Sequence, residues 1–319
     1  MIGCCFFIVS GSTTQTSFPK MEGLNVRLLV LSLCVLFRFP KVYGVTFEGQ
    51  GRHLQLEFAD LASRRGGSVI AIATNESAML LSWDSTSIAH KDDTLLTMVS
   101  RQKLRTLSRH LGLGATGISS DINYVSNLAF DLTSQHSFSF GSPAPAVRIA
   151  ESLASEMHQR TLRRGSRPFG LRACLVGYSD TVGGQVLEID PFGNCLNCKY
   201  SVIGKNADKI GKHLGPALER VDLKGFAMIS TLELARLGAQ AIADATNEVT
   251  EEDAKEQEEN GREYLDTLKD EKRKIRKEDL TAEQVLVALD VAVVGKWRPF
   301  TILSPGQVLI SETDPRPPK

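Results

Sequence analysis

Cysteine and histidine are the side chains of this sequence with the greatest potential for metal or redox chemistry, and the chain has six of each. Cys195 and Cys198 form one Cys-x-x-Cys motif, a spacing that occurs in zinc sites and in redox-active pairs. A zinc site also needs a second such pair or a histidine at ligand spacing, and the sequence near the motif offers neither. The motif is therefore interpreted as two cysteines around the start of a strand, and we expect neither a metal site nor a cofactor.

The other cysteines and histidines show no ligand or catalytic pattern. Three cysteines fall within the first 34 residues, and Cys174 lies inside an apolar strand pattern, so a disulfide framework is not expected. The histidines lack the spacing of a metal site or a catalytic triad, and we interpret them as surface or capping residues: His53, His90, His110, His136, His158 and His213.

The composition favours one large folded domain with tails. A chain of 319 residues with 42% hydrophobic residues can bury a full core. Lysine plus arginine and aspartate plus glutamate balance at 37 each, so nothing indicates nucleic acid or a strongly acidic partner. The apolar run at 28–37 is too short to span a bilayer, and no membrane partner is expected.

The first 44 residues differ in character from the rest and are treated as an N-terminal extension. Arg27 precedes the apolar run at 28–37, and a small residue, Gly44, follows soon after, which resembles a secretory signal peptide. Such a peptide would have to start at Met21, because the residues before it make a poor basic region. Three interpretations stay open: a mis-assigned start or retained upstream sequence, a true targeting peptide, and an unusual cytosolic tail.

Hydrophobic periodicity predicts groups of strands that alternate with pairs of helices. The first expected helix has Leu54, Phe58 and Leu61 on one face. Further helices are expected at about 117–132, 145–162, 206–219 and 231–247. Strands are expected at 68–74, 78–83, 104–107, 111–116, 171–178, 185–189, 196–203, 289–294 and 300–303. Because hairpins link the strands and the helices come in pairs, we expect an α+β fold with two packed antiparallel sheets and helices outside.

Two further features of the pattern involve charge. Asp121 falls in the first turn of the helix expected at 117–132, where a carboxylate suits the positive end of the helix dipole. Residues 250–279 form an insertion that is acidic first and basic afterwards. Such blocks are typical of a solvated helix or a disordered loop, which we favour over a dedicated docking element. Residues 313–319 are treated as a tail.

Residues 46–59 resemble the N-terminal signature of proteasome α-type subunits. The matching positions are Phe47, Gly51, Arg52, Gln55, Glu57 and Ala59, with Phe58 in the position of a tyrosine. Further matches follow in the family's order: Arg167–Gly170, the Asp190–Gly193 turn and Ile203–Gly204. The resemblance covers about residues 45–250 and 280–310. It implies a four-layer αββα sandwich of the N-terminal-nucleophile hydrolase type, with an α-type loop and helix at 45–65 and the sandwich domain at 66–312.

The same resemblance raises the question of catalysis. Catalytic β-type relatives use an N-terminal threonine whose own amine is the base, with an aspartate and a lysine nearby. Ser68, Asp84 and Lys103 occupy comparable places here, and the preceding Gly67 resembles a processing junction. A β-like N-terminal-nucleophile peptidase that exposes Ser68 after processing is therefore the alternative function. Because cleavage there would discard the helix at 54–62, the resemblance implies a non-catalytic subunit instead.

As an α-type subunit, the chain would be a structural and gating part of the α ring of the proteasome core particle. The resemblance implies ATP- and ubiquitin-dependent protein degradation in the cytoplasm and nucleus. The implied partners are other α-type and β-type subunits and the C-termini of regulatory ATPases or activators. The type of α subunit is not assigned.

The resemblance also assigns expected sites. An activator-docking pocket is expected at Lys103, Gly67 and Glu57, where the lysine would meet a terminal carboxylate. A gate segment is expected at Phe47, Gly49, Gly51, Arg52 and Phe58. Gly49 replaces the proline that the family has in this turn, and glycine leaves the backbone freer. The ring role is therefore better supported by the sequence than normal gating.

Overall fold

The computed structural model of the chain describes residue 49 and residues 51–84, 103–163, 165–222, 230–259, 280–296 and 298–303. The chain separates into one unit of residues 1–43 and another of residues 44–319, and every described residue belongs to the second unit. The predicted extension at 1–44 and the tail at 313–319 therefore lie outside the described residues, as do residues 260–279 of the predicted insertion.

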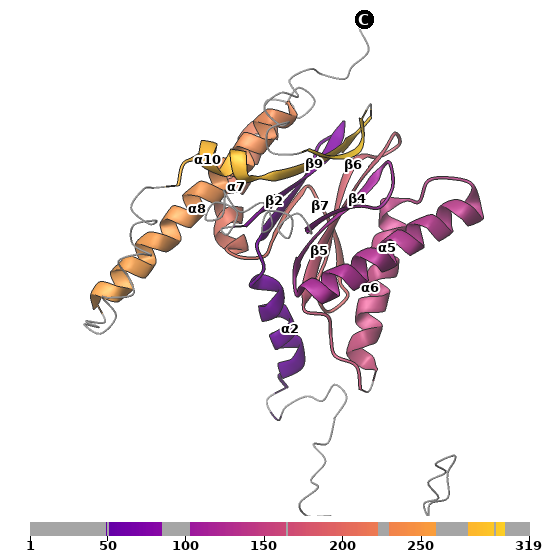
Figure 1. Cartoon of the computed structure of the whole chain (residues 1–319), viewed down its shortest axis with the longest axis horizontal. Coiled ribbons are helices and arrows are strands. Elements are labelled where there is room, and N and C mark those ends of the chain that lie inside the picture. The colour runs from indigo at the N-terminus through magenta and orange to yellow at the C-terminus, as the bar shows by residue number, and fades with distance from the viewer. Residues whose placement is uncertain are drawn as a thin grey trace, which may run out of the picture. The chain divides into compact units, whose positions relative to one another are not determined.

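Ten strands in the described part of the chain form two five-stranded antiparallel sheets (Figure 1). The first sheet has the order β10-β9-β2-β1-β8: β1 Ser68–Ala73, β2 Ser77–Trp83, β8 Tyr200–Ile203, β9 Asp290–Gly295 and β10 Arg298–Leu303. The second sheet has the order β3-β4-β5-β6-β7: β3 Leu104–Thr106, β4 Leu111–Gly117, β5 Leu171–Ser179, β6 Gly183–Ile189 and β7 Cys195–Cys198. The hairpin predicted from β1 and β2 is present, with Ser68 opposite Trp83.

Helices cover the outer face of each sheet, which gives the predicted four-layer αββα sandwich (Figure 1). The helices over the second sheet are α5 Ser119–Phe140 and α6 Ala146–Leu162. Those over the first sheet are α7 Ala207–Asp222, α8 Thr231–Glu259 and α10 Ala282–Ala288, while α2 Leu54–Arg64 lies against β4 and β5. Among the helices that the structure describes, none is long and apolar enough to cross a bilayer.

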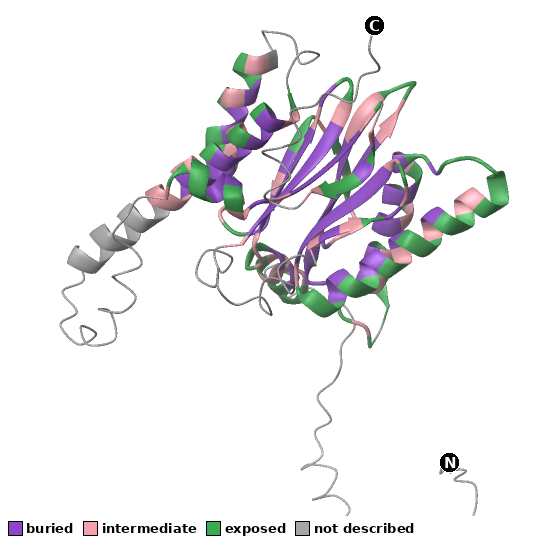
Figure 2. Cartoon of the chain, turned by 45° about the horizontal axis from the view of Figure 1, so that its top comes forward, coloured by how far each residue is buried: buried purple, intermediate pink, exposed green. Residues whose placement is uncertain are grey.

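Three apolar layers hold the sandwich together. Val69 and Ala71 of β1 pack between the sheets, while Ile70 and Ile72 of the same strand pack under α7 and α8. Both faces of β1 are therefore buried, which explains why its sequence is a continuous apolar run rather than an alternating one. The central strands are buried along their length, and the helices are buried mainly on their inner faces (Figure 2).

Two details of the predicted pattern were wrong. The single strand expected at 196–203 is two strands, because the chain leaves the second sheet after β7 and joins β1 in the first sheet as β8. The short helix α10 was not predicted, since seven residues are too few for a clear period. Its N-terminus does carry a readable signal, a capping box formed by Thr281 and Gln284.

Asp121 does more than complement the helix dipole. It is 4% exposed and accepts hydrogen bonds from Arg167 Nη1 at 2.7 Å and Arg167 Nη2 at 2.6 Å. It also accepts one from the Gly170 backbone N–H at 3.0 Å. Burial by itself raises the pKa of this carboxyl, but the bonds from Arg167 and Gly170 outweigh it, and the pKa lies below its ordinary value. The Arg167–Gly170 block thus fixes the loop before β5 to the start of α5.

We expect this site to stabilise the fold in a pH-dependent way. A depressed carboxyl pKa adds stability above the unfolded-state pKa of about 4, and this stability is lost as pH falls through the folded-state pKa. Asp121→Asn should lower the free energy of unfolding by about 1.5–3 kcal/mol at pH 7. Urea titrations from pH 7 to 3 should show the wild type converging on the variant. A difference in unfolding free energy between wild type and Asp121→Asn that stays constant over this pH range would contradict the stabilising role of the carboxylate.

Candidate functional site

Gly67, Ser68 and Lys103 lie at the end of the sandwich where β1 begins. Gly66 and Gly67 join α2 to β1, and both carbonyl oxygens are held: Gly66 O accepts Lys205 N at 2.9 Å, and Gly67 O accepts Thr116 Oγ1 at 2.7 Å. A Cβ atom at Gly66 would overlap Thr116 Oγ1 and the backbone of Gly117. The link is therefore tightly packed, and a residue with a side chain would push it away from the sheet.

Lys103 and Gly67, two of the residues expected in the activator-docking pocket, lie next to each other. Lys103 Nζ lies 2.8 Å from Asp84 Oδ2 at the end of β2, and the lysine side chain is only 14% exposed. A Cβ atom at Gly67 would overlap Lys103 Nζ and the Trp83 carbonyl oxygen. The glycine therefore leaves the space that the ammonium occupies beside its carboxylate.

Glu57 does not belong to this group within the described part of the chain. It lies in the first turn of α2, about two helical turns before Gly66, and Arg52 binds its carboxylate through Nε–Oε1 at 3.0 Å and Nη2–Oε2 at 2.5 Å. The hydrogen bond from Arg52 lowers the pKa of this carboxyl. The three expected pocket residues thus occupy two places, one at each end of α2.

The expected gate segment is described only in part. Phe47 lies outside the described residues, and Gly49, Gly51 and Arg52 are exposed. Gly51 has a φ of 77°, a left-handed conformation that glycine adopts without strain. The next residue, His53, accepts the Leu56 N–H through Nδ1 at 3.3 Å and so caps α2, as predicted, although it is buried rather than on the surface.

Ser68 is a buried structural residue. Its side chain is 2% exposed, and its hydroxyl donates to the Lys205 carbonyl oxygen at 2.7 Å. As long as the Gly67–Ser68 peptide bond is present, Ser68 has no α-amine that could act as its base. The neighbouring groups hold this part of the chain in place through the Ser68 hydroxyl and the Gly67 carbonyl oxygen.

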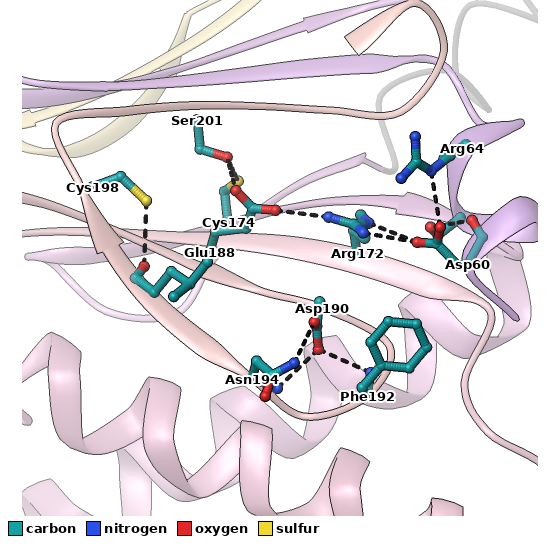
Figure 3. A network of polar contacts seen from close by, with 12 residues as sticks. Asp60, Arg64, Arg172, Cys174, Glu188, Asp190, Phe192, Asn194, Cys198 and Ser201 are labelled. Carbon is teal, nitrogen blue, oxygen red and sulfur yellow. Dashed lines mark hydrogen bonds and ion pairs between the residues drawn. The ribbon is translucent and has the colours of Figure 1, made fainter. Parts of the chain in front are cut away.

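A polar network that the sequence did not reveal fixes α2 to both sheets (Figure 3). Asp60 of α2 accepts Arg172 Nη2 at 2.8 Å, and Arg172 Nη1 donates to Glu188 Oε1 at 2.9 Å. Glu188 Oε2 then accepts the hydroxyl of Ser201 in β8 at 2.7 Å. Because β5 and β6 lie in one sheet and β8 in the other, this Asp60–Arg172–Glu188 network connects three layers of the fold.

The apolar stripe predicted on α2 faces away from the sandwich. Phe58 is 63% exposed and Leu61 51% exposed, whereas the residues that α2 buries are Ala59 and Ser63. Phe58 and Leu61 line a pocket of about 480 Å³ together with Ile118, which is also exposed. Exposed apolar side chains of α2 and of Ile118 therefore lie together at this pocket.

The Cys-x-x-Cys motif lies within β7, with one cysteine at each end of the strand. Residues three apart in a strand point to opposite faces and lie about 10 Å apart, which is too far for a disulfide. Burial also raises the pKa of both thiols, so they stay protonated at neutral pH. No group of three or more potential metal ligands occurs among the residues that the structure describes.

The αββα sandwich, with helix α2 before β1, is the N-terminal-nucleophile type of architecture that the sequence predicted. Residues 63–254, more than half of the chain, match the family described as "Proteasome subunit". The chain belongs to the proteasome subunit family.

Relatives of the chain carry the names of α-type subunits. Proteasome subunit alpha type-4 of Petunia hybrida is 29% identical over 160 residues, which cover 50% of this chain and 63% of that protein. Proteasome subunit alpha type-6 of Saccharomyces cerevisiae is 25% identical over 259 residues, 81% of this chain and 92% of that protein. Proteasome subunit alpha type-1 of Drosophila melanogaster is 25% identical over 255 residues, which cover 80% of this chain and 76% of that protein.

The expected resemblance to α-type subunits is confirmed. The similarity is spread over types 1, 4 and 6 at comparable identity, so it does not assign one type. This chain spans less than two thirds of the length of the petunia relative that it matches.

Proposed function

We propose that this chain is a non-catalytic structural and gating subunit of the α ring of the proteasome core particle, acting in ATP- and ubiquitin-dependent protein degradation. The observation that carries the proposal is the link between α2 and β1. Hydrogen bonds to the Gly66 and Gly67 carbonyl oxygens and from the Ser68 hydroxyl build this link into the sandwich, so cleavage before Ser68 would break contacts of the fold. The peptidase that exposes Ser68 is accordingly the weaker alternative.

Exposed apolar side chains support assembly with other α-type and β-type subunits. Besides the α2 stripe, α5 presents Phe130, Phe138 and Phe140 to solvent, and Phe138 is 93% exposed. A monomer gains nothing from aromatic rings in water, whereas subunits of obligate complexes bury such surfaces over large areas. We expect neighbouring subunits to cover these helices, and the assembled chain to reside in the cytoplasm and nucleus.

Lys103 supports a docking role for the C-termini of regulatory ATPases or activators. An ammonium group has three donors, and Asp84 uses one of them, so a second carboxylate can bind the same nitrogen. Asp84 would then orient the ammonium for the incoming terminal carboxylate. Since Glu57 lies at the far end of α2, we expect it to contribute to a pocket from the neighbouring subunit rather than beside its own Lys103.

The gate role rests on the segment that precedes α2. Gly51 and Gly49 give this segment a turn with few steric restrictions, and the Arg52–Glu57 ion pair holds its end against the helix. We expect the segment to lie over the axial channel with more freedom than a proline-containing turn would have.

Assembly is the direct test of the proposal. The tagged native chain should co-purify in a very large complex that contains other α-type and β-type chains, because burial of its exposed apolar side chains stabilises the assembly. Size-exclusion chromatography and identification of the co-purified chains would measure this. Recovery of the chain only as a monomer would contradict the proposal.

Catalytic silence is a separate expectation. Ser68→Ala removes only a buried hydroxyl, so all peptidase activities of the assembled complex should remain at wild-type levels. Fluorogenic peptides of different specificity, assayed on complexes purified through the tagged chain, would measure this. Loss of one cleavage specificity in the assembled Ser68→Ala complex would instead favour the peptidase alternative.

A further inference from the structure

A second concave site lies at the opposite end of the sandwich from Ser68. Four segments that are distant in sequence enclose a groove of about 690 Å³: the turn before β4, the loop before α6, the β5–β6 hairpin and the β9–β10 hairpin. Its size falls within the range of ordinary ligand pockets. None of the residues expected from the family signature lines this groove.

The lining of this groove is basic, although the whole chain has no net charge. Arg109, Lys296 and Arg298 contribute three cations, and Asp180 is the acid that lines it. Arg109 and Arg298 form no ion pair with any residue that the structure describes. Two guanidinium groups are therefore available to an anionic ligand in one hollow.

Asp180 does not neutralise these arginines. No ion pair joins Asp180 to Arg109 or Arg298 among the described residues. Burial and the neighbouring Asp180 raise the pKa of the Tyr178 hydroxyl, so this group stays protonated. The charge of Glu76 also raises the pKa of this phenol. Asp180 thus leaves both guanidinium groups of the groove without an ion pair in the described part of the chain.

The N-terminus of α6 adds positive character to the same wall. Ala146 and Val147 line the groove, and they are the first residues of a 17-residue helix. The N-cap, Pro145, makes no side-chain capping bond, and the first turn carries no acidic residue. The partial positive charge at the N-terminus of α6 therefore lies beside the groove.

We propose that this groove binds an acidic peptide segment of a partner protein. The two arginines would pair with carboxylates, and the proline and valine side chains of the rim, Pro143, Val182 and Pro299, would contact the apolar residues between them. Nucleic acid fits less well, because it is recognised by an extended basic surface and this chain has balanced charge. The proposal does not depend on the ring role, since a chain that failed to enter the core particle would still bind the peptide.

The test uses the purified full chain and a fluorescein-labelled eight-residue peptide of alternating glutamate and leucine. Fluorescence anisotropy should show saturable binding that weakens with added salt. Arg109→Gln and Arg298→Gln should each weaken it about tenfold, the effect of one charge-assisted hydrogen bond. Lys212→Gln on the exposed face of α7 is the matched control and should bind like wild type.

Folding can be separated from binding in this experiment. The Arg109 carbonyl oxygen accepts Phe300 N at 2.6 Å, and the glutamine variant keeps this backbone bond, so its thermal unfolding should match wild type. Three results would each overturn the proposal. The chain with both arginines replaced could bind the peptide as tightly as wild type, or wild type could fail to bind it. Wild type could also bind a peptide with glutamine in place of glutamate as tightly as the acidic peptide. Tighter arginine-dependent binding of inorganic polyphosphate than of the peptide would also overturn it in favour of a polyanion site.

Discussion

Replacing Arg172 with methionine should lower the free energy of unfolding by about 3–5 kcal/mol. Methionine keeps most of the side-chain volume but leaves Asp60 and Glu188 without their shared cation, and these carboxylates are only 19% and 18% exposed. Some water reaches all three groups, so the effect should fall near the lower end of this range. Urea denaturation of the full chain, monitored by circular dichroism, would measure it.

Arg64→Met is the matched control for this experiment. Arg64 also pairs with Asp60, at 3.0 Å, but its side chain is 47% exposed, so its loss should cost about 1 kcal/mol or less. Because Arg172 fixes α2 to β5, trypsin cleavage after Arg65 should accelerate in Arg172→Met and change little in Arg64→Met. A stability loss of the same small size in both variants would show that the network does not anchor α2.

Lys103→Ala should reduce the affinity of an activator tail peptide for this subunit's pocket about tenfold to hundredfold. The variant loses a charge-assisted hydrogen bond worth about 1.5–3 kcal/mol in a partly buried position. Anisotropy with a labelled tail peptide on the assembled core particle is the sharper measurement, because an intact activator ring binds several pockets at once and would hide the loss.

Two controls separate the charge of Lys103 from its place in the fold. A tail peptide with an amidated C-terminus should bind the wild-type particle as weakly as the acid peptide binds Lys103→Ala, and the two losses should not add. Asp84→Asn keeps the ammonium and should retain most of the binding. Additive losses, or an unchanged affinity in Lys103→Ala, would mean that Lys103 only pairs with Asp84.

The layers of the fold could be predicted from the sequence because they depend on local period. The apolar run of β1 and the paired helical faces of α5 and α6 are contained in short windows. The same windows do not show where a strand changes sheet, which is why β7 and β8 were predicted as one element. The periodicity of α2 likewise identified an apolar face but could not show that this face points away from its own core.

The polar parts of the site were harder to predict because their partners are distant in sequence. Asp60 and Arg172 are 112 residues apart, and neither belongs to a motif with a known spacing. Lys103 and Gly67 were found only through family resemblance, while Asp84 was considered for catalysis and proved to be the lysine's partner. The basic groove went unnoticed because its arginines come from opposite parts of a chain whose overall charge is zero.

The glycine link before β1 also bears on how such a chain could ever become a protease. Cleavage before Ser68 would release the amine that catalysis needs, but it would also detach the carbonyl groups that Lys205 N and Thr116 Oγ1 hold in place. In physical terms α2 resembles a propeptide whose removal would break hydrogen bonds of the folded sandwich. A catalytic role for Ser68 would therefore require a fold that tolerates the loss of these contacts.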